Sequence, residues 1–241
     1  MKNLEKVLNK FKILFPDNIY FYFMKKILQI PEEPNIQIDW ESINYNRIAV
    51  LNQLISLFKP SNYLEIGCDN NYSFNSVPIS KKIGVDPSKG GNFRDTSDNF
   101  FIQNQDSFDL IFIDGLHEYP QVRKDVVNSI NHSNTDSWIV LHDVFPRNHL
   151  EEHTPCKTSG PWTGDVWKIG FELMSVRDIE FKIVMVDFGV LVIRKIKGDI
   201  QIAPIAEQLI NADFSYFYSN RQNLPLVNWN EFVSWTEKFK K

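Results

Sequence analysis

The sequence predicts an α/β protein built on a doubly wound, mostly parallel sheet with a C-terminal antiparallel hairpin. Short apolar runs alternate with segments of helical periodicity through the middle of the chain. The runs at 108–113 and 138–141 are apolar, as is typical of parallel strands covered on both faces. Two further runs, at 181–186 and 190–194, flank an Asp-Phe-Gly turn and predict the hairpin.

The other elements follow in regular order along the chain. A helix is expected over 40–58, where a Lys-Pro-Ser sequence ends it. The remaining expected strands are 63–66 and 82–85, and the remaining expected helices are 96–103, 118–131 and 165–176. A long loop spans 144–163, and loops of this length are usually functional or disordered.

Three regions follow from this pattern. Residues 1–40 are expected to form a helical extension, 41–197 the α/β domain, and 198–241 a helical tail packed on that domain. Residues 13–28 are aromatic and basic, which favours an amphipathic helix on the domain over a membrane or partner contact.

Composition limits the classes of function. The 241 residues suit one sizeable domain, and a net charge of -4 without a basic block argues against nucleic acid as a partner. No apolar stretch reaches the roughly 20 residues that cross a bilayer, so no integral membrane segment is expected. Cys68 and Cys156 lack metal-binding spacing and no signal peptide is evident, which favours a reduced, cytoplasmic protein. Homo-oligomerisation stays open.

Chemically useful side chains gather at the ends of the predicted strands. Ligands of open α/β sheets bind beyond the carboxyl ends of the strands, so these residues share one rim. The residues at the first four strand ends are Glu65, Gly67, Asp86, Asp114, His117, His142 and Asp143.

Several of these positions suit a nucleoside-bearing cofactor. Gly67 allows a sharp turn and close ligand approach, and Asp86 stands where a carboxylate can accept both ribose hydroxyls. Thr96, Ser97 and Asp98 open a helix and can present polar groups beside a purine. Taken singly, Asp86 is better explained as a turn residue, and Thr96 or Ser97 as a helix cap. Together, in this order, they favour the cofactor.

These residues resemble class I S-adenosylmethionine-dependent methyltransferases and, more narrowly, the methyltransferase-24 domain family. The stretches that carry the resemblance are 63–67, 84–87, 96–101, 108–119, 139–143 and 162–168. The resemblance covers roughly 45–196 and implies a seven-stranded, Rossmann-like methyltransferase fold, with 41–197 as the methyltransferase domain. It also implies S-adenosylmethionine as the cofactor.

The resemblance assigns the parts of the cofactor to single residues. Glu65 and Gly67 would border the methionine moiety, with Asp114 also at the cofactor. Asp86 would hold the ribose, and Ser97 and Asp98 would lie near the adenine.

One departure concerns the loop after the first strand. Gly67 is followed by Cys68-Asp69-Asn70-Asn71 in place of further glycines, although Asn tolerates left-handed backbone well. This departure keeps open a non-catalytic cofactor-binding or scaffold relative of the same fold. A nicotinamide dinucleotide enzyme is disfavoured, because no Gly-x-Gly-x-x-Gly follows the first strand.

The spacing Asp114-x-x-His117, followed by His142-Asp143, is similar to metal-dependent O-methyltransferases that act on macrolide sugars. That resemblance implies a sugar or sugar-bearing small molecule as acceptor, His117 as general base, and a divalent cation, Mg²⁺ or Mn²⁺, at Asp114 and Asp143. His142 is the third expected ligand and replaces an acidic residue of that group. Magnesium prefers oxygen ligands, so a softer ion, or none, stays open.

The histidines have plainer interpretations beside these. A His with a pKa near neutrality can take a hydroxyl proton, but His117 could instead bond a backbone group at a helix start. His142 could serve packing alone. A metal cluster of His142 with His149 and His153 is disfavoured, because the long loop fixes no spacing between them.

Overall fold

The computed structural model describes residues 26–27, 29–158, 160–196, 200, 202 and 207–240. The helices expected within 1–25, and with them most of the expected amphipathic helix, lie outside the described residues. Residues 30–39 form no regular element and lead into the short 3-10 helix η1 (Trp40–Ser42).

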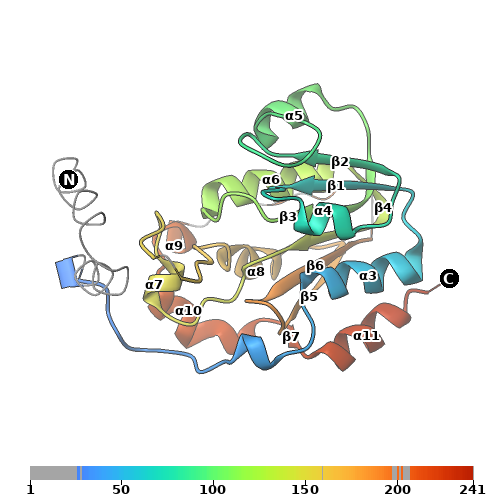
Figure 1. Cartoon of the computed structure of the whole chain (residues 1–241). Helices are drawn as coiled ribbons and strands as arrows, with labels where there is room; N and C mark the ends of the chain where they lie inside the picture. Colours follow the sequence, from blue (N-terminus) through green and yellow to red (C-terminus); the bar gives the residue numbers. More distant parts are fainter. Residues whose placement is uncertain are drawn as a thin grey trace.

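One seven-stranded sheet forms the centre of the molecule, in the order β2-β1-β3-β4-β6-β5-β7 (Figure 1). The strands are β1 (Asn62–Ile66), β2 (Lys81–Val85), β3 (Phe108–Ile113), β4 (Ser133–Leu141), β5 (Ile179–Val184), β6 (Val190–Lys195) and β7 (Leu226–Val227). Strand β6 runs antiparallel to both of its neighbours, and every other pairing is parallel. The predicted doubly wound, mostly parallel fold is therefore confirmed.

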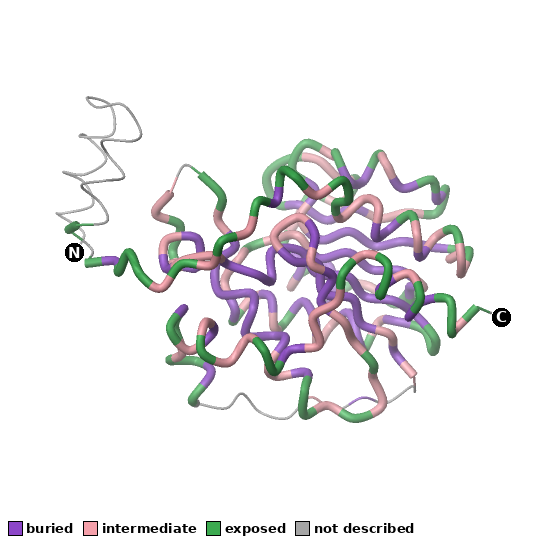
Figure 2. Tube along the Cα trace, turned by 90° about the horizontal axis from the view of Figure 1, so that it is seen from below, coloured by how far each residue is buried: buried purple, intermediate pink, exposed green. Residues whose placement is uncertain are grey.

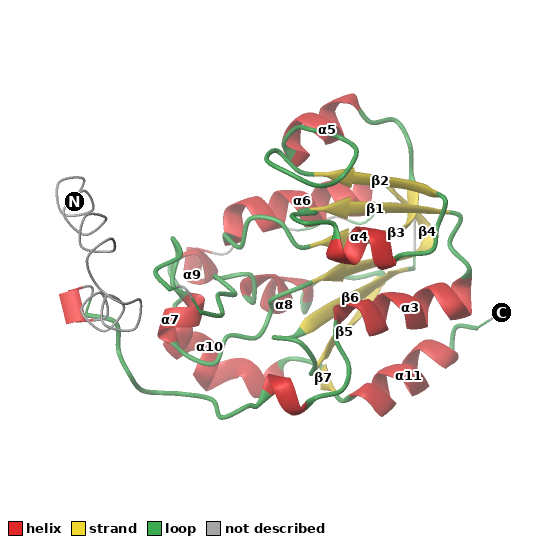
Figure 3. Ribbon diagram, viewed as in Figure 1, coloured by secondary structure: helices red, strands yellow, loops and turns green. Residues whose placement is uncertain are grey.

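Helices cover both faces of this sheet (Figure 3). They are α3 (Arg47–Phe58), α4 (Tyr72–Ser76), α5 (Ser97–Gln103), α6 (Tyr119–Asn131), α7 (His149–Glu152), α8 (Lys168–Leu173), α9 (Glu207–Ile210), α10 (Phe214–Asn220), the 3-10 helix η2 (Arg221–Asn223) and α11 (Trp229–Glu237). Among the described residues, none of these is both long and apolar enough to cross a membrane.

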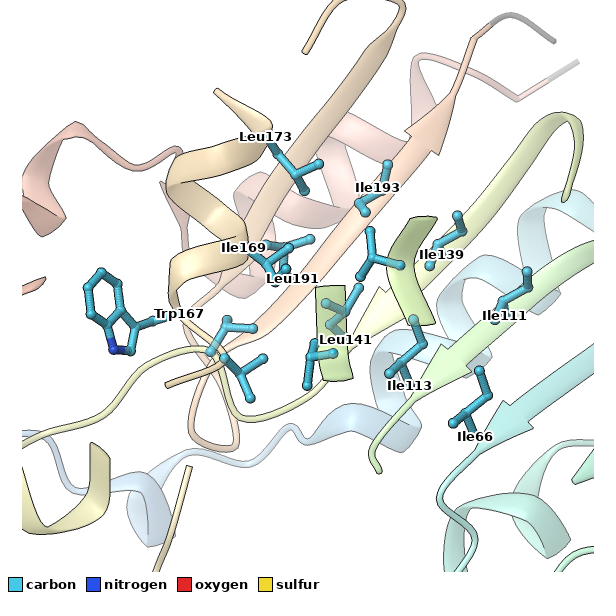
Figure 4. Close-up of a cluster of buried hydrophobic side chains, with 14 of the residues drawn as sticks. Ile66, Ile111, Ile113, Ile139, Leu141, Trp167, Ile169, Leu173, Leu191 and Ile193 are labelled. Carbon is cyan, nitrogen blue, oxygen red and sulfur yellow. The ribbon is translucent and has the colours of Figure 1, made fainter. Parts of the chain in front are cut away.

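Alternating residues of the central strands build two separate cores. In β3, Leu110 and Phe112 belong to the cluster that contains residues of α3, α4 and α11. Ile111 and Ile113 belong to the opposite cluster, with residues of α5, α6, α8 and α10 (Figure 4). Figure 2 shows the strands as the buried centre of the trace. Burial on both faces explains why these strands are apolar at nearly every position.

Several expected elements differ in extent from the structure, and two differ most. The helix expected over 40–58 is divided into η1 and α3, because the Asn46 side chain accepts hydrogen bonds from the backbone of Ile48 and Ala49 and starts a new helix. Strand β4 begins at Ser133, well before the expected 138, since its polar first half still pairs with β3 at Phe108.

The C-terminal region supplies the seventh strand. Strand β7 pairs in parallel with β5 at the edge of the sheet, so residues beyond 197 extend the sheet itself. Helix α11 follows, with a capping box between Asn228 and Glu231. Its Trp235 packs edge-on against Trp138 of β4 at 5.5 Å between ring centroids.

Candidate functional site

A network of ionisable side chains occupies the carboxyl ends of β3 and β4. It consists of Arg47, Asp114, His117, His142, Asp143 and Asp187. His142 lies at its centre, where its Nδ1 is 3.1 Å from Asp114 Oδ1 and 3.1 Å from Asp143 Oδ2. Parallel pairing of β3 with β4 puts these strand ends side by side, as the sequence predicts.

His117 lies at the edge of this network, held by the long loop. Its Nδ1 is 3.0 Å from the carbonyl oxygen of Trp162, and its ring stacks on the Trp162 indole at 5.1 Å. Its Nε2 is 3.5 Å from Asp114 Oδ1. Gly164 adopts a φ of +57°, and a Cβ there would lie 1.7 Å from the His117 carbonyl oxygen. Only glycine fits this close contact, which locks residues 162–164 onto His117.

Two members of the network were not predicted from the sequence. Asp187 Oδ2 accepts hydrogen bonds from the Arg47 backbone N–H (3.0 Å) and from Arg47 Nη1 (2.8 Å), and lies 3.4 Å from His142 Nε2. Arg47 Nε lies 3.5 Å from Asp114 Oδ2. Asp187 follows β5, whose carboxyl end reaches the same rim, so the strand-end rule could have found it. Arg47 carries no such signal.

The buried charges of the network shift one another's pKa values. Burial would raise the pKa of Asp114, but His142 and His117 hold it well below its ordinary value. Burial would lower the pKa of His142, but Asp143 and Asp114 raise it well above that value. Burial would likewise lower the pKa of His117, but Asp114 and Asp143 raise it. Mutually shifted groups of this kind are typical of functional sites.

The geometry of this network suits a divalent cation. Asp114, His117 and Asp143 each offer a ligand atom, and these atoms all lie within 4.8 Å of one another. No other such group of three exists in the described part of the chain. His142 lies against the same two carboxylates, but its Nε2 faces Asp187. Two carboxylates with an imidazole suit a borderline ion such as Mn²⁺ better than Mg²⁺.

A cavity of about 470 Å³ adjoins the network. Its lining residues are Ile66, Gly67, Asp69, Val85, Asp86, Pro87, Ser88, Thr96, Ser97, Asp98, Asp114, Gly115, Leu116, Gln121 and Asp125. Five of the six residues predicted to contact the cofactor are among them, and the volume lies in the usual range for small-molecule sites.

Glu65 is the predicted residue that does not line the cavity. It is 1% exposed, and its carboxylate accepts a hydrogen bond from the Tyr63 hydroxyl on the same face of β1. Burial raises its pKa to about 7. Glu65 therefore faces the interior, with its neighbours Leu64 and Ile66 on the other side of the strand.

Asp86 joins the two loops that border the cavity. Its carboxylate accepts hydrogen bonds from the backbone N–H groups of Cys68, Asp69, Ser88 and Lys89, and from the Ser88 hydroxyl. Although burial opposes ionisation, the hydrogen bonds from Lys89, Asp69 and Ser88 lower its pKa to about 2. In place of a glycine-rich sequence, this carboxylate closes the 67–71 loop.

The start of α5 is tied to α6. Thr96 caps α5 by accepting a hydrogen bond from the Asn99 backbone, as its plainer interpretation predicts. Gln121 Nε2 lies 3.3 Å from Ser97 Oγ and 3.0 Å from Asp98 Oδ1. Ser97 and Asp98, which are predicted to lie near the adenine, therefore contact Gln121 of α6, a residue that the sequence did not indicate.

Comparisons with known proteins agree with the observed fold. The methyltransferase-24 model, described as a methyltransferase domain, matches residues 85–144. A structure from Klebsiella pneumoniae described as an O-methyltransferase is 14% identical, with 76% of this chain and 91% of that chain covered and a TM-score of 0.50. An SAH-bound methyltransferase from Podospora anserina is 18% identical, with coverages of 76% and 89% and a TM-score of 0.49. No curated protein sequence matches the chain. The chain therefore has the Rossmann-like fold of class I methyltransferases, and residues 85–144 match the methyltransferase-24 domain.

Proposed function

We propose that the protein is an S-adenosylmethionine-dependent O-methyltransferase that methylates a hydroxyl of a sugar or sugar-bearing small molecule. The observation that carries this proposal is the position of Asp114, which both lines the cavity and belongs to the ionisable network. A cofactor in the cavity would therefore lie beside the side chains best suited to move a proton. Methyl transfer to a hydroxyl requires a group close to the methyl donor that takes the hydroxyl proton.

In this proposal His117 is the general base. Its Nδ1 lies against the Trp162 carbonyl, so a ring that carries its proton on Nδ1 has Nε2 available for the acceptor hydroxyl proton. Asp114 and Asp143 stabilise the imidazolium that forms. S-adenosylmethionine, when bound, would supply the methyl group to the acceptor oxygen and be converted to S-adenosylhomocysteine.

Asp114 and Asp143 would hold the divalent cation. A bound cation lowers the pKa of the acceptor hydroxyl and orients it. His117 cannot be a ligand through Nε2 and accept the proton there, so we assign the carboxylates to the cation and His117 to the proton. His142, hydrogen-bonded to Asp114 and 3.1 Å from Asp143 Oδ2, would orient both carboxylates.

The test is release of S-adenosylhomocysteine from S-adenosylmethionine in the presence of a panel of sugar acceptors. We expect turnover with at least one hydroxylated sugar, loss of turnover after chelation, and recovery with Mn²⁺ or Mg²⁺. Full turnover after exhaustive chelation would contradict the metal role. Methylation confined to nitrogen acceptors would contradict the hydroxyl as the methylated group.

A second candidate is a non-catalytic relative that binds the cofactor. The engagement of both Asp86 oxygens by the two loops favours it, because a ribose would have to compete for that carboxylate. Binding of S-adenosylhomocysteine without methyl transfer to any acceptor on the panel would support this candidate.

A further inference from the structure

The ionisable network contains a permanent cation of its own. Its three carboxylates each lie within 3.5 Å of a basic nitrogen atom, and they belong to Asp114, Asp143 and Asp187. Two of the basic groups are imidazoles, whose charge depends on pH, but the third is the guanidinium of Arg47, which stays charged in proteins. Any divalent cation that enters the network therefore meets a positive charge that is already there.

The Arg47 guanidinium reaches two carboxylates and holds them unequally. Asp187 Oδ2 accepts hydrogen bonds from Arg47 Nη1 at 2.8 Å and from the Arg47 backbone N–H at 3.0 Å. Arg47 Nε lies 3.5 Å from Asp114 Oδ2 and, although buried, has no hydrogen-bond partner in the described part of the chain. Asp187 thus anchors Arg47, whereas the contact with Asp114 is an attraction between charges without a hydrogen bond.

The two oxygens of Asp114 face different basic groups. Oδ1 lies 3.1 Å from His142 Nδ1 and 3.5 Å from His117 Nε2, whereas Oδ2 lies 3.5 Å from Arg47 Nε. Oδ1 is therefore engaged by the imidazoles, and Oδ2 is the oxygen that a cation can reach with the least disturbance of the network. Arg47 stands beside that oxygen.

We propose that Arg47 is a built-in competitor of the divalent cation, because its guanidinium neutralises Asp114 and opposes cation binding there. A cation held by Asp114 and Asp143 would stand close to the guanidinium, and like charges a few ångströms apart repel strongly in a partly buried site. Since Asp187 keeps two hydrogen bonds to Arg47, the guanidinium retains a partner when Asp114 turns to the cation. This inference rests on the proposed function, which assigns the cation to Asp114 and Asp143.

The test is a Mn²⁺ titration of the purified protein followed by electron paramagnetic resonance, which measures free Mn²⁺ without any turnover. Arg47→Gln removes the charge and keeps a side-chain amide that can donate to Asp187. We expect it to bind Mn²⁺ at least about 10-fold more tightly than the wild-type protein, because the charge repulsion is gone. Arg94→Gln is the matched control: it removes an arginine charge 3.7 Å from Asp86 on the same rim, where solvent screens it, and should keep the wild-type affinity.

A second substitution checks where the additional affinity arises. Adding Asp143→Asn to Arg47→Gln removes one of the two carboxylates assigned to the cation, so the tight binding should be lost. Tight binding that survives this change would place the ion elsewhere and overturn the inference.

The remaining outcomes separate this inference from the function on which it rests. Equal or weaker Mn²⁺ binding by a folded Arg47→Gln would overturn it, because Arg47 would then position Asp114 for the cation. If Arg47→Gln fails to fold, Arg47→Lys must bind Mn²⁺ more tightly than the wild-type protein, since a single ammonium can serve Asp187 but not Asp114 at the same time; equal or weaker binding by this variant would also overturn the inference. Absence of Mn²⁺ binding by every folded protein in the series would contradict the cation in the proposed function itself.

Discussion

At the ends of β1 and β2, the Asp86 carboxylate accepts hydrogen bonds from four backbone N–H groups and one hydroxyl. At the ends of β3 and β4, Asp114 and Asp143 instead face the imidazoles of His117 and His142. Backbone amides exchange no proton with a carboxylate, whereas an imidazole can both accept and donate one. One half of the rim therefore holds loops in place, and the other half can carry chemistry.

The largest expected effect is on catalysis, from His117→Ala. Loss of a general base lowers the turnover rate by roughly 10²–10⁴-fold. S-adenosylhomocysteine affinity should be unchanged, because the imidazole serves the acceptor. Turnover and calorimetric binding measure the two quantities, and His153→Ala, a histidine outside the network, is the matched control.

Two results would refute this role for His117. Near-normal turnover in His117→Ala would show that the ring only fixes the loop at Trp162. Joint loss of cofactor binding and thermal stability would show that it holds the start of α6.

The second prediction concerns Asp86→Ala. From the sequence alone we would expect weaker cofactor binding with unchanged stability, but the structure predicts that both fall, because the carboxylate joins two loops. The free energy of unfolding should fall by about 1.5–3 kcal/mol, the range for hydrogen bonds to a charged group. Ser88→Ala, which removes only the hydroxyl donor, should have a much smaller effect. Denaturant titration measures each change, and an unchanged unfolding midpoint for Asp86→Ala would contradict this role.

The same residue predicts a pH dependence of stability. The folded-state pKa of Asp86 is about 2, below its ordinary value of 3.8. Its contribution is therefore fully present above about pH 4 and lost as the pH falls towards 2. Unfolding curves of wild-type protein and Asp86→Ala should converge over this interval. A constant difference down to pH 2 would contradict the assignment.

The smallest expected effect is that of Asp187→Asn. The amide keeps one acceptor oxygen for Arg47 but loses the charge that faces His142. We expect the free energy of unfolding to fall by about 1 kcal/mol and turnover to fall far less than in His117→Ala. A turnover loss equal to that of His117→Ala, at unchanged stability, would place Asp187 at the substrate instead.

The sequence predicts the sheet well because burial on both faces leaves its central strands almost wholly apolar. It does not locate β7, since two residues carry no periodicity. Strand-end logic finds Asp114, His117, His142 and Asp143 because parallel strands end at a common rim.

Strand-end logic fails where the orientation of a side chain, or the packing of a helix, determines which residues reach the site. It puts Glu65 at the rim, where the resemblance assigns it to the cofactor, but alternation along β1 turns that side chain towards Tyr63. Arg47 reaches the site only because α3 packs with its first residue against the β5–β6 turn. Sequence neighbours of Arg47 give no sign of that contact.

The central claim is that the cavity beside Asp114 binds a methyl-donor nucleoside. Its most direct test is calorimetric titration of the purified protein with S-adenosylmethionine, S-adenosylhomocysteine and NAD. We predict saturable binding of the first two, with one site per chain, and no binding of NAD. Binding of NAD, or no binding of either methionine-derived nucleoside by the folded protein, would contradict the account.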